Sequence, residues 1–263
     1  MALQLYYRKC SISTNYRYMM RLHSPFTQLR SLTLYLVLAL LWGAGACKSA
    51  KTHYREGLER ASKNDYTGAV REYDAAIAKR PNDGTLYRLR GVAKYEMDDF
   101  DGAFTDFTQA IGLDSSDAES YKFRGDIKQN RQQYQASIAD YNQAIRFQPS
   151  YAKAFNNRGL NKMRLKDMKG AAQDFSQAIA LQNDYALAYL NRANLRMRER
   201  QYRPAMEDYD KAISLDTTLA AAYYNRGVLF HNQKKRKSAC ADWQKALELG
   251  TAQANALIKR YCR

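Results

Sequence analysis

The sequence predicts an all-α fold, an α-solenoid of paired helices, for everything after the N-terminal segment. Three observations predict it. Small, alanine and aromatic residues each recur every 34 positions along the 263-residue chain. There are only 4 Pro and 13 Gly, so few residues interrupt helices. Apolar residues make up 46% of the chain, enough for a continuous core.

The first 46 residues are expected to be a signal peptide. The uncharged stretch at residues 32–46 follows Arg30 and is shorter than the roughly 20 residues that a membrane span needs. A short apolar core with a basic flank and small residues at its end is typical of an export signal. Met19 and Met20 are alternative starts, and either would place residues 1–18 outside the protein.

Cys47 follows the sequence AGA at residues 44–46. Small residues at these places suit ordinary signal peptidase. They also resemble the bacterial lipobox, in which the cysteine receives diacylglycerol, although lipoboxes usually have Leu where Ala44 stands. We expect a lipid-anchored Cys47, with residues 47–49 as a short linker. A plain secreted protein and an uncleaved anchor are the alternatives.

Six repeats are expected over residues 50–251, because four columns of residues keep the same phase. The repeats are residues 50–83, 84–117, 118–151, 152–185, 186–219 and 220–251. The small-residue column is Gly57, Gly91, Gly125, Gly159, Ala193 and Gly227. The aromatic column is Tyr73, Phe107, Tyr141, Phe175, Tyr209 and Trp243. Two alanine-rich columns accompany them, which makes coincidence an untenable explanation.

These columns resemble the tetratricopeptide pattern. The resemblance implies that each repeat is two antiparallel helices, A and B, and that the repeats stack into a right-handed superhelix. Glycine or alanine is needed where A and B cross closely, since a larger side chain would push the axes apart. One repeat cannot bury its apolar face alone, so stacking supplies the core.

A capping helix is expected over residues 252–263. Ala254, Leu257, Ile258 and Tyr261 have the spacing of one apolar helix face, which would cover the exposed end of the stack.

Cys240 and Cys262 are expected to form a disulfide. Cys240 comes early in helix B of the sixth repeat, and Cys262 lies at the end of the next helix. Antiparallel packing brings these two ends together. Such a bond would stabilise the cap by about 3 kcal/mol and is typical of an oxidising compartment. The alternative is two reduced, buried thiols.

Five arginines on helix A are each followed 16 residues later by an aspartate on helix B. The pairs are Arg90 and Asp106, Arg124 and Asp140, Arg158 and Asp174, Arg192 and Asp208, and Arg226 and Asp242. The first repeat has Glu56 and Glu72 instead. The arginines could form a ligand-binding row. The matched spacing favours internal ion pairs, within or between repeats.

The concave face is the surface expected to bind a partner. In tetratricopeptide proteins helix A lines it, and here that face holds more basic than acidic residues. The residues expected to bind a partner are Arg88, Lys122, Asn156, Asn157, Arg164, Asn191, Asn194, Arg198, Tyr224 and Asn225. Asn157, Asn191 and Asn225 occupy one repeat position, and an asparagine can both donate to and accept from a peptide backbone. The alternative is that they only space neighbouring helices.

A carboxylate clamp is not expected, because no lysine precedes these asparagines. The basic run at residues 234–237 resembles a nucleic-acid patch, but an exported protein would rarely meet nucleic acid, so we interpret it as a solvated turn. No spacing of His, Cys, Ser or acidic residues indicates a metal site or an activated nucleophile. We therefore expect no enzyme activity, no metal and no cofactor.

The sequence thus predicts a non-catalytic scaffold on the periplasmic side of a bacterial membrane, or a periplasmic or secreted one if Cys47 is not lipidated. Its expected partner is a protein or peptide. With a formal net charge of +16, an anionic envelope polymer or lipid is the alternative partner.

Overall fold

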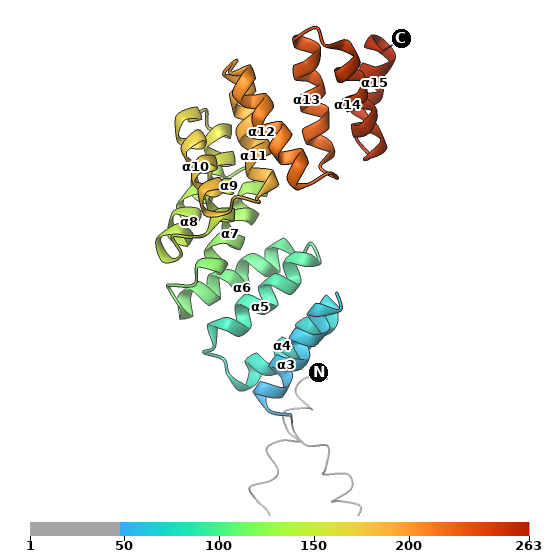
Figure 1. Ribbon diagram of the computed structural model, residues 1–263. Coiled ribbons are helices and arrows are strands. Elements are labelled where there is room, and N and C mark those ends of the chain that lie inside the picture. The colour runs from blue at the N-terminus through green and yellow to red at the C-terminus, as the bar shows by residue number, and fades with distance from the viewer. Residues whose placement is uncertain (1–47, 263) are drawn as a thin grey trace, which may run out of the picture.

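The computed structural model describes residues 48–262, and Cys47 and the predicted signal peptide lie outside them. This part of the chain is all helical, which confirms the predicted fold class (Figure 1). The A helices are α3 (Ala50–Ser62), α5 (Gly84–Glu96), α7 (Ala118–Asn130), α9 (Ala152–Arg164), α11 (Ala186–Arg198) and α13 (Ala220–Asn232). The B helices are α4 (Tyr66–Lys79), α6 (Phe100–Leu113), α8 (Tyr134–Phe147), α10 (Met168–Leu181), α12 (Tyr202–Leu215) and α14 (Arg236–Glu248). The cap is α15 (Gln253–Tyr261).

The turn between the A and B helices has the same form in every repeat. One residue in each turn has a left-handed backbone with φ between 60° and 66°: Asn64, Asp98, Gln132, Lys166, Arg200 and Lys234. In three repeats an aspartate then caps helix B by accepting a hydrogen bond from a glycine N–H, as Asp167 does from Gly170 at 2.9 Å. Short turns of one geometry keep all the repeats in the same phase.

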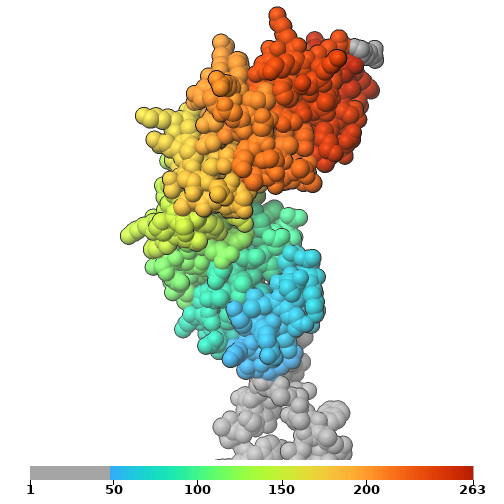
Figure 2. Space-filling view, viewed as in Figure 1, coloured from blue at the N-terminus to red at the C-terminus, as the bar shows by residue number. Residues whose placement is uncertain are grey.

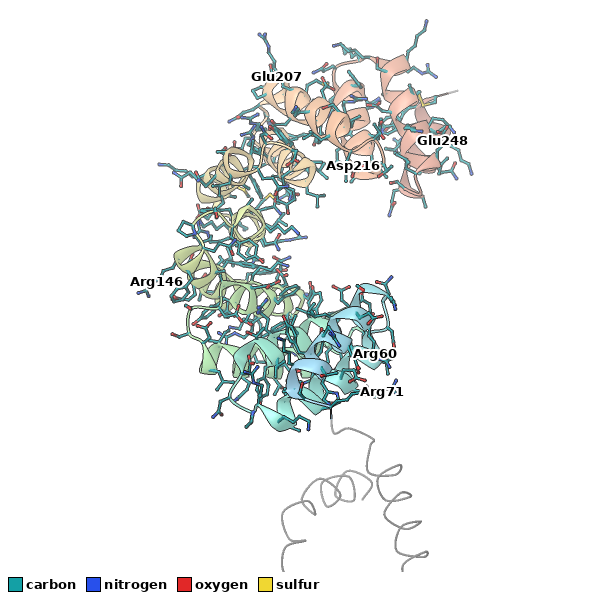
Figure 3. All side chains as sticks on the ribbon, turned by 60° about the horizontal axis from the view of Figure 1, so that its bottom comes forward. Arg60, Arg71, Arg146, Glu207, Asp216 and Glu248 are labelled. Carbon is teal, nitrogen blue, oxygen red and sulfur yellow. A yellow bond between two sulfur atoms is a disulfide. The ribbon has the colours of Figure 1, made fainter. Side chains whose placement is uncertain are left out.

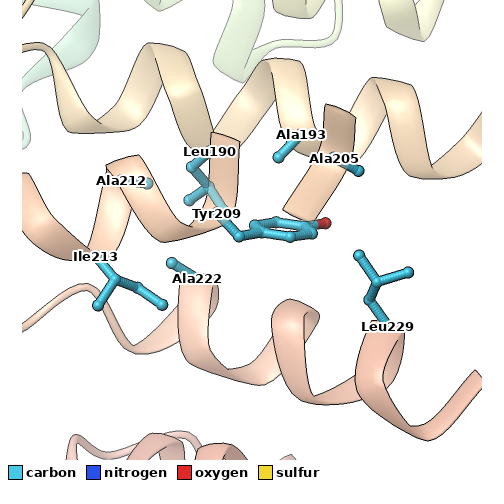
Figure 4. Close-up of a cluster of buried hydrophobic side chains, with 8 residues drawn as sticks. All are labelled: Leu190, Ala193, Ala205, Tyr209, Ala212, Ile213, Ala222 and Leu229. Carbon is cyan, nitrogen blue, oxygen red and sulfur yellow. The ribbon is translucent and has the colours of Figure 1, made fainter. Parts of the chain in front are cut away.

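The small residue of each A helix makes room for the aromatic ring of its B helix. A Cβ placed on Gly159 would lie 2.8 Å from Cε1 of Phe175, closer than real Cβ contacts come. In the fifth repeat the position is Ala193, and the ring of Tyr209 lies between α11 and α13 (Figure 4). The aromatic column is buried throughout, so it forms the centre of the continuous core.

The helix pairs follow one another along a curved rod, with α3 at one end and α15 at the other (Figures 1 and 3). The space-filling view shows the molecule hollowed on one side between its first and last repeats (Figure 2). Within residues 48–262, none of the helices combines the length and the apolar character needed to cross a bilayer.

Candidate functional site

The A helices line the inner side of the curve. Each A helix from α5 to α11 contacts the next A helix along the rod, in addition to its own B helix. Helices converge on the inner side of a curved stack, so these contacts place the A helices there. The candidate functional site is therefore the concave surface formed by α3, α5, α7, α9, α11 and α13, which we call the groove.

The five arginines of the 16-residue pattern lie between the helices, where they hold the repeats together. Arg158 donates from Nε and Nη2 to the two carboxylate oxygens of Asp174, at 2.9 and 2.6 Å. Asp174 is 3% exposed. The same two-bond contact joins Arg90 with Asp106, Arg124 with Asp140, Arg192 with Asp208, and Arg226 with Asp242. Every pair is within one repeat, and this geometry corresponds to the ion-pair interpretation.

Each arginine also bonds the preceding repeat. Arg158 Nη1 donates to Asn142 Oδ1 on α8 at 2.7 Å, and its guanidinium lies 5.2 Å from the centre of the Phe155 ring. The other four arginines make the corresponding contacts, to Asp74, Thr108, Ser176 and Asp210. Hydrogen bonds to Asp242 and Asp210 raise the pKa of Arg226 above its ordinary value despite burial. One guanidinium thus joins three helices.

A second cation on four of the five aspartates was missed by the sequence analysis. Lys162 Nζ lies 2.9 Å from Asp174 Oδ2. Lys94, Lys128 and Arg196 contact their aspartates in the same way. Each of these residues stands four positions after the arginine, on the same helix face, and that spacing is the signal that could have revealed it. In the sixth repeat the position is Phe230, so among residues 48–262 Asp242 pairs with Arg226 alone.

The first repeat contains the one cluster of His, Cys, Asp and Glu within residues 48–262 that could hold a metal ion. His53, Glu56 and Glu72 have ligand atoms within 4.8 Å of one another. Lys48 lies 2.6 Å from Glu56, and Arg60 lies 3.7 Å from Glu72. His53 Nδ1 shares a 2.7 Å hydrogen bond with Glu72. Both carboxylates therefore already have cationic partners, and we interpret the cluster as this repeat's form of the ion-pair network.

The basic residues expected in the first half of the groove are neutralised within the protein. Arg88 forms ion pairs with Asp117, which caps the start of α7, and with Glu119 on α7 in the next repeat. Lys122 lies 2.7 Å from Asp126 on the same helix. These residues therefore offer a partner little uncompensated charge.

The three equivalent asparagines link successive A helices. Asn157 donates to Asp126 at 2.9 Å, and Asn225 donates to Asn194 at 2.8 Å. Asn191 donates to Asn156 at 2.9 Å. Asn156, which we expected in the groove, is 2% exposed, because its amide lies between Asn157 and Asn191 and bonds both.

Two buried tyrosines complete these links. The Tyr141 hydroxyl donates to Asp126 at 2.6 Å, and the Tyr209 hydroxyl donates to Asn194 at 2.8 Å. Burial raises the pKa of both hydroxyls, and the charge of Asp126 adds to the effect at Tyr141. Where the aromatic residue is Phe175, the position equivalent to Asp126 is apolar. That pairing of tyrosine with a polar partner is a further signal that the sequence analysis missed.

The second half of the groove keeps polar groups that are free for a partner. The carboxamide oxygens of Asn191 and Asn225 accept no hydrogen bond from the described part of the chain, and both side chains are partly exposed. Arg164 and Arg198 end α9 and α11, are exposed, and form no ion pair within residues 48–262. Tyr224 is half-buried on α13. Donors, acceptors and positive charge thus remain on repeats four to six.

A cavity of about 670 Å³ lies where the first two repeats meet, lined in part by Arg80, Asp83, Arg88, Asp114 and Asp117. Arg80 pairs with Asp83, and Arg88 pairs with Asp117. Asp114 accepts from the N–H and hydroxyl of Ser116, which lowers its pKa. Each of these charged groups therefore already has a partner within the protein.

Cys240 and Cys262 form a disulfide with their Cα atoms 5.7 Å apart, which is consistent with the expected bond. It joins α14 to the residue after α15. The basic run at residues 234–237 begins in the α13–α14 turn and continues into the first turn of α14.

Paired helices around a partly polar concave face define a helical-repeat scaffold, a class of protein that holds other proteins. Family models described as TPR repeat match residues 125–166 and 201–234, and models described as tetratricopeptide repeat match residues 54–118 and 220–249. The matches cover more than half of the chain, and the chain belongs to the tetratricopeptide repeat family. Members of this family bind protein or peptide partners and are generally non-catalytic.

Solved structures share the fold at low sequence identity. Pseudomonas aeruginosa pilF is 18% identical with a TM-score of 0.72, covering 80% of this chain and 96% of its own. The Cut9–Hcn1 structure is 18% identical with a TM-score of 0.73, covering 88% of this chain and 46% of its own. YrrB, described as a TPR protein with an unusual peptide-binding site, is 20% identical with a TM-score of 0.57, covering 72% of this chain and 97% of its own. Among curated protein sequences, none matches this chain.

Proposed function

We propose that this protein is a non-catalytic adaptor of the bacterial cell envelope, which holds an extended segment of a partner protein in its groove. The observation that carries the proposal is the unused hydrogen-bonding capacity of Asn191 and Asn225 beside the unpaired Arg164 and Arg198. Arg164 and Arg198 stand at the ends of α9 and α11, on two consecutive repeats, where their exposed guanidinium groups can pair with acidic groups of a partner.

The spacing of the groove suits an extended peptide. Neighbouring helices stand about 8–10 Å apart, and an extended chain rises about 3.3 Å per residue. Successive asparagines would therefore meet a peptide at every third residue. Since Asn191 and Asn225 offer acceptors, they would bind peptide N–H groups, while Arg164 and Arg198 would favour acidic side chains on that segment. A related fold described with a peptide-binding site supports this use.

The test of the groove is capture of the partner from a membrane extract by the purified protein. Arg164→Glu and Arg198→Glu together are expected to abolish capture, because they reverse the two arginine charges that lie beside Asn191 and Asn225 and have no ion-pair partner within residues 48–262. Arg146→Glu is the control for a charge reversal outside the groove, since it places one such reversal on α8, on the outer side of the rod (Figure 3). Equal capture of the partner by both variants would exclude the groove as the surface that binds it. Capture of a protease-resistant anionic polymer would instead favour the alternative partner.

The envelope location rests on the sequence of residues 31–47 and is tested separately. Cys47→Ser is expected to move the protein from the membrane fraction to the soluble fraction and to end incorporation of labelled fatty acid. A Cys47→Ser protein that stays in the membrane, with no label in the parent protein, would exclude lipidation.

A further inference from the structure

The C-terminal end of the rod carries a second cavity, apart from the groove's free residues. It measures about 300 Å³ and is lined by His231, Lys234, Arg236, Arg260 and Tyr261. These residues come from the end of α13, the α13–α14 turn, the start of α14 and the end of α15. Three cationic side chains and an imidazole therefore converge from three helices, and no acidic side chain lines the cavity.

The charges at this cavity differ from those of the five interhelical arginines. Elsewhere the interhelical arginines are paired with buried aspartates. Here Lys234, Arg236 and Arg260 form no ion pair within residues 48–262, and the neighbouring Lys235 and Lys237 form none either. Three like charges around one small volume repel each other, which destabilises the empty site. A bound anion would remove that cost.

The side chains around the cavity are held in position by contacts other than ion pairs. Arg236 Nε donates to the backbone oxygen of Tyr261 at 2.5 Å. The centres of the Tyr261 and His231 rings lie 4.3 Å apart. The Arg260 guanidinium lies 5.2 Å from the centre of the Tyr261 ring. The disulfide at Cys262 fixes the end of α15 against α14. These contacts leave Nη1 and Nη2 of Arg236 free to donate.

The start of α14 adds to the positive potential. Helices α4, α6 and α10 begin with a capping aspartate, at Asp65, Asp99 and Asp167. Helix α14 begins instead with Lys235, and no side chain accepts from its first N–H groups. A helix N-terminus carries partial positive charge, so a lysine there is unfavourable unless an anion is near.

We propose that this cavity binds the phosphate group of a small molecule or lipid. Arg236 and Arg260 present the forked donors that match phosphate oxygens, and Lys234 adds a point charge. The volume exceeds that of a bare phosphate, and the Tyr261 and His231 rings give an adjoining surface for the rest of the ligand.

The test is calorimetric titration of the full-length protein with inorganic phosphate at constant ionic strength. One saturable site is expected, and Arg260→Gln is expected to weaken it at least tenfold. Lys259→Gln is the matched control, because it removes the same charge from the adjacent exposed residue, which does not line the cavity. Both variants are expected to keep the parent melting temperature. The absence of a saturable site, or equal weakening by both variants, would overturn the proposal.

Vesicles distinguish the source of the phosphate. If the ligand is a lipid headgroup, phosphatidylglycerol vesicles are expected to compete with inorganic phosphate, phosphatidylcholine vesicles are not, and Arg260→Gln should reduce binding to the former. If the ligand is a free phosphate compound, neither vesicle competes. If phosphate does not bind at this cavity, the groove proposal still stands, because its test changes Arg164 and Arg198, which do not line the cavity.

Discussion

Replacing Arg158 with alanine is expected to lower the free energy of unfolding by about 3 kcal/mol. Arg158 makes two hydrogen bonds to Asp174, which is 3% exposed. Removing one partner of a buried ion pair costs about 3–5 kcal/mol, because the other charge is left in a poorly solvated place. Lys162 stays 2.9 Å from Asp174 and compensates part of that cost, so we expect the lower end of the range.

The loss would appear in urea and thermal unfolding followed by circular dichroism at the helical band. For a chain of this size, 3 kcal/mol corresponds to roughly 6–12 °C in melting temperature. The double variant Arg158→Ala, Asp174→Ala should cost about 2 kcal/mol less than the sum of the two single variants.

The sixth repeat supplies an internal comparison. Arg226→Ala should cost more than Arg158→Ala, because Phe230 replaces the second cation and Asp242 would lose its sole ion-pair partner. A loss below about 1 kcal/mol for Arg158→Ala, the value of a surface ion pair, would refute the reasoning. The reasoning would also be refuted if Arg158→Ala lost partner binding while its melting temperature stayed unchanged. That result would show that the five arginines form a binding surface.

Three other perturbations test the packing. Gly159→Leu should destabilise by more than about 2 kcal/mol, since its Cβ alone would meet Phe175 at 2.8 Å, and a melting temperature equal to the parent's would contradict this. Reducing the bond between Cys240 and Cys262 should remove about 3 kcal/mol of stability from the cap, measured as faster amide exchange in α15, whereas unchanged exchange would mean that the cap packs without it. Burial raises the pKa of Tyr73 to about 12, so the neutral form is favoured in the folded state. The stability that this neutral hydroxyl contributes is complete below pH 10 and is lost as pH rises from 10 to 12. Tyr73→Phe should therefore reduce the loss of stability in an alkaline unfolding titration, while the other buried tyrosines keep their share of it.

The parts of the fold that the sequence predicts well are those that repeat in register. Gly159 and Phe175 recur at 34-residue steps because every repeat meets the same crossing, and Arg158 keeps its distance from Asp174 for the same reason. Lys162 could have been added to that network, because it stands one helical turn after Arg158.

The groove was predicted less well, because contacts between repeats depend on side-chain direction as well as on position. Arg88 counts as a free groove charge in the sequence, but its partner Glu119 lies 31 residues away, on the next A helix. Asn156 and Asn157 are adjacent in sequence, yet one is buried and the other is partly exposed. Asn156 is buried because its amide bonds both Asn157 and Asn191, a contact with the next repeat that the spacing within one repeat does not reveal.

The arginine contacts between repeats alternate in length along the rod. The contacts are 2.5–2.7 Å where the acceptor is Asp74, Asn142 or Asp210, and 3.3–3.5 Å where it is Thr108 or Ser176. Other contacts cross the two junctions that have the longer arginine bonds: Arg88 pairs with Glu119 across one, and Asn191 donates to Asn156 across the other. These two junctions therefore do not depend on the arginine contact alone, and loss of one arginine would weaken such a junction without separating its repeats.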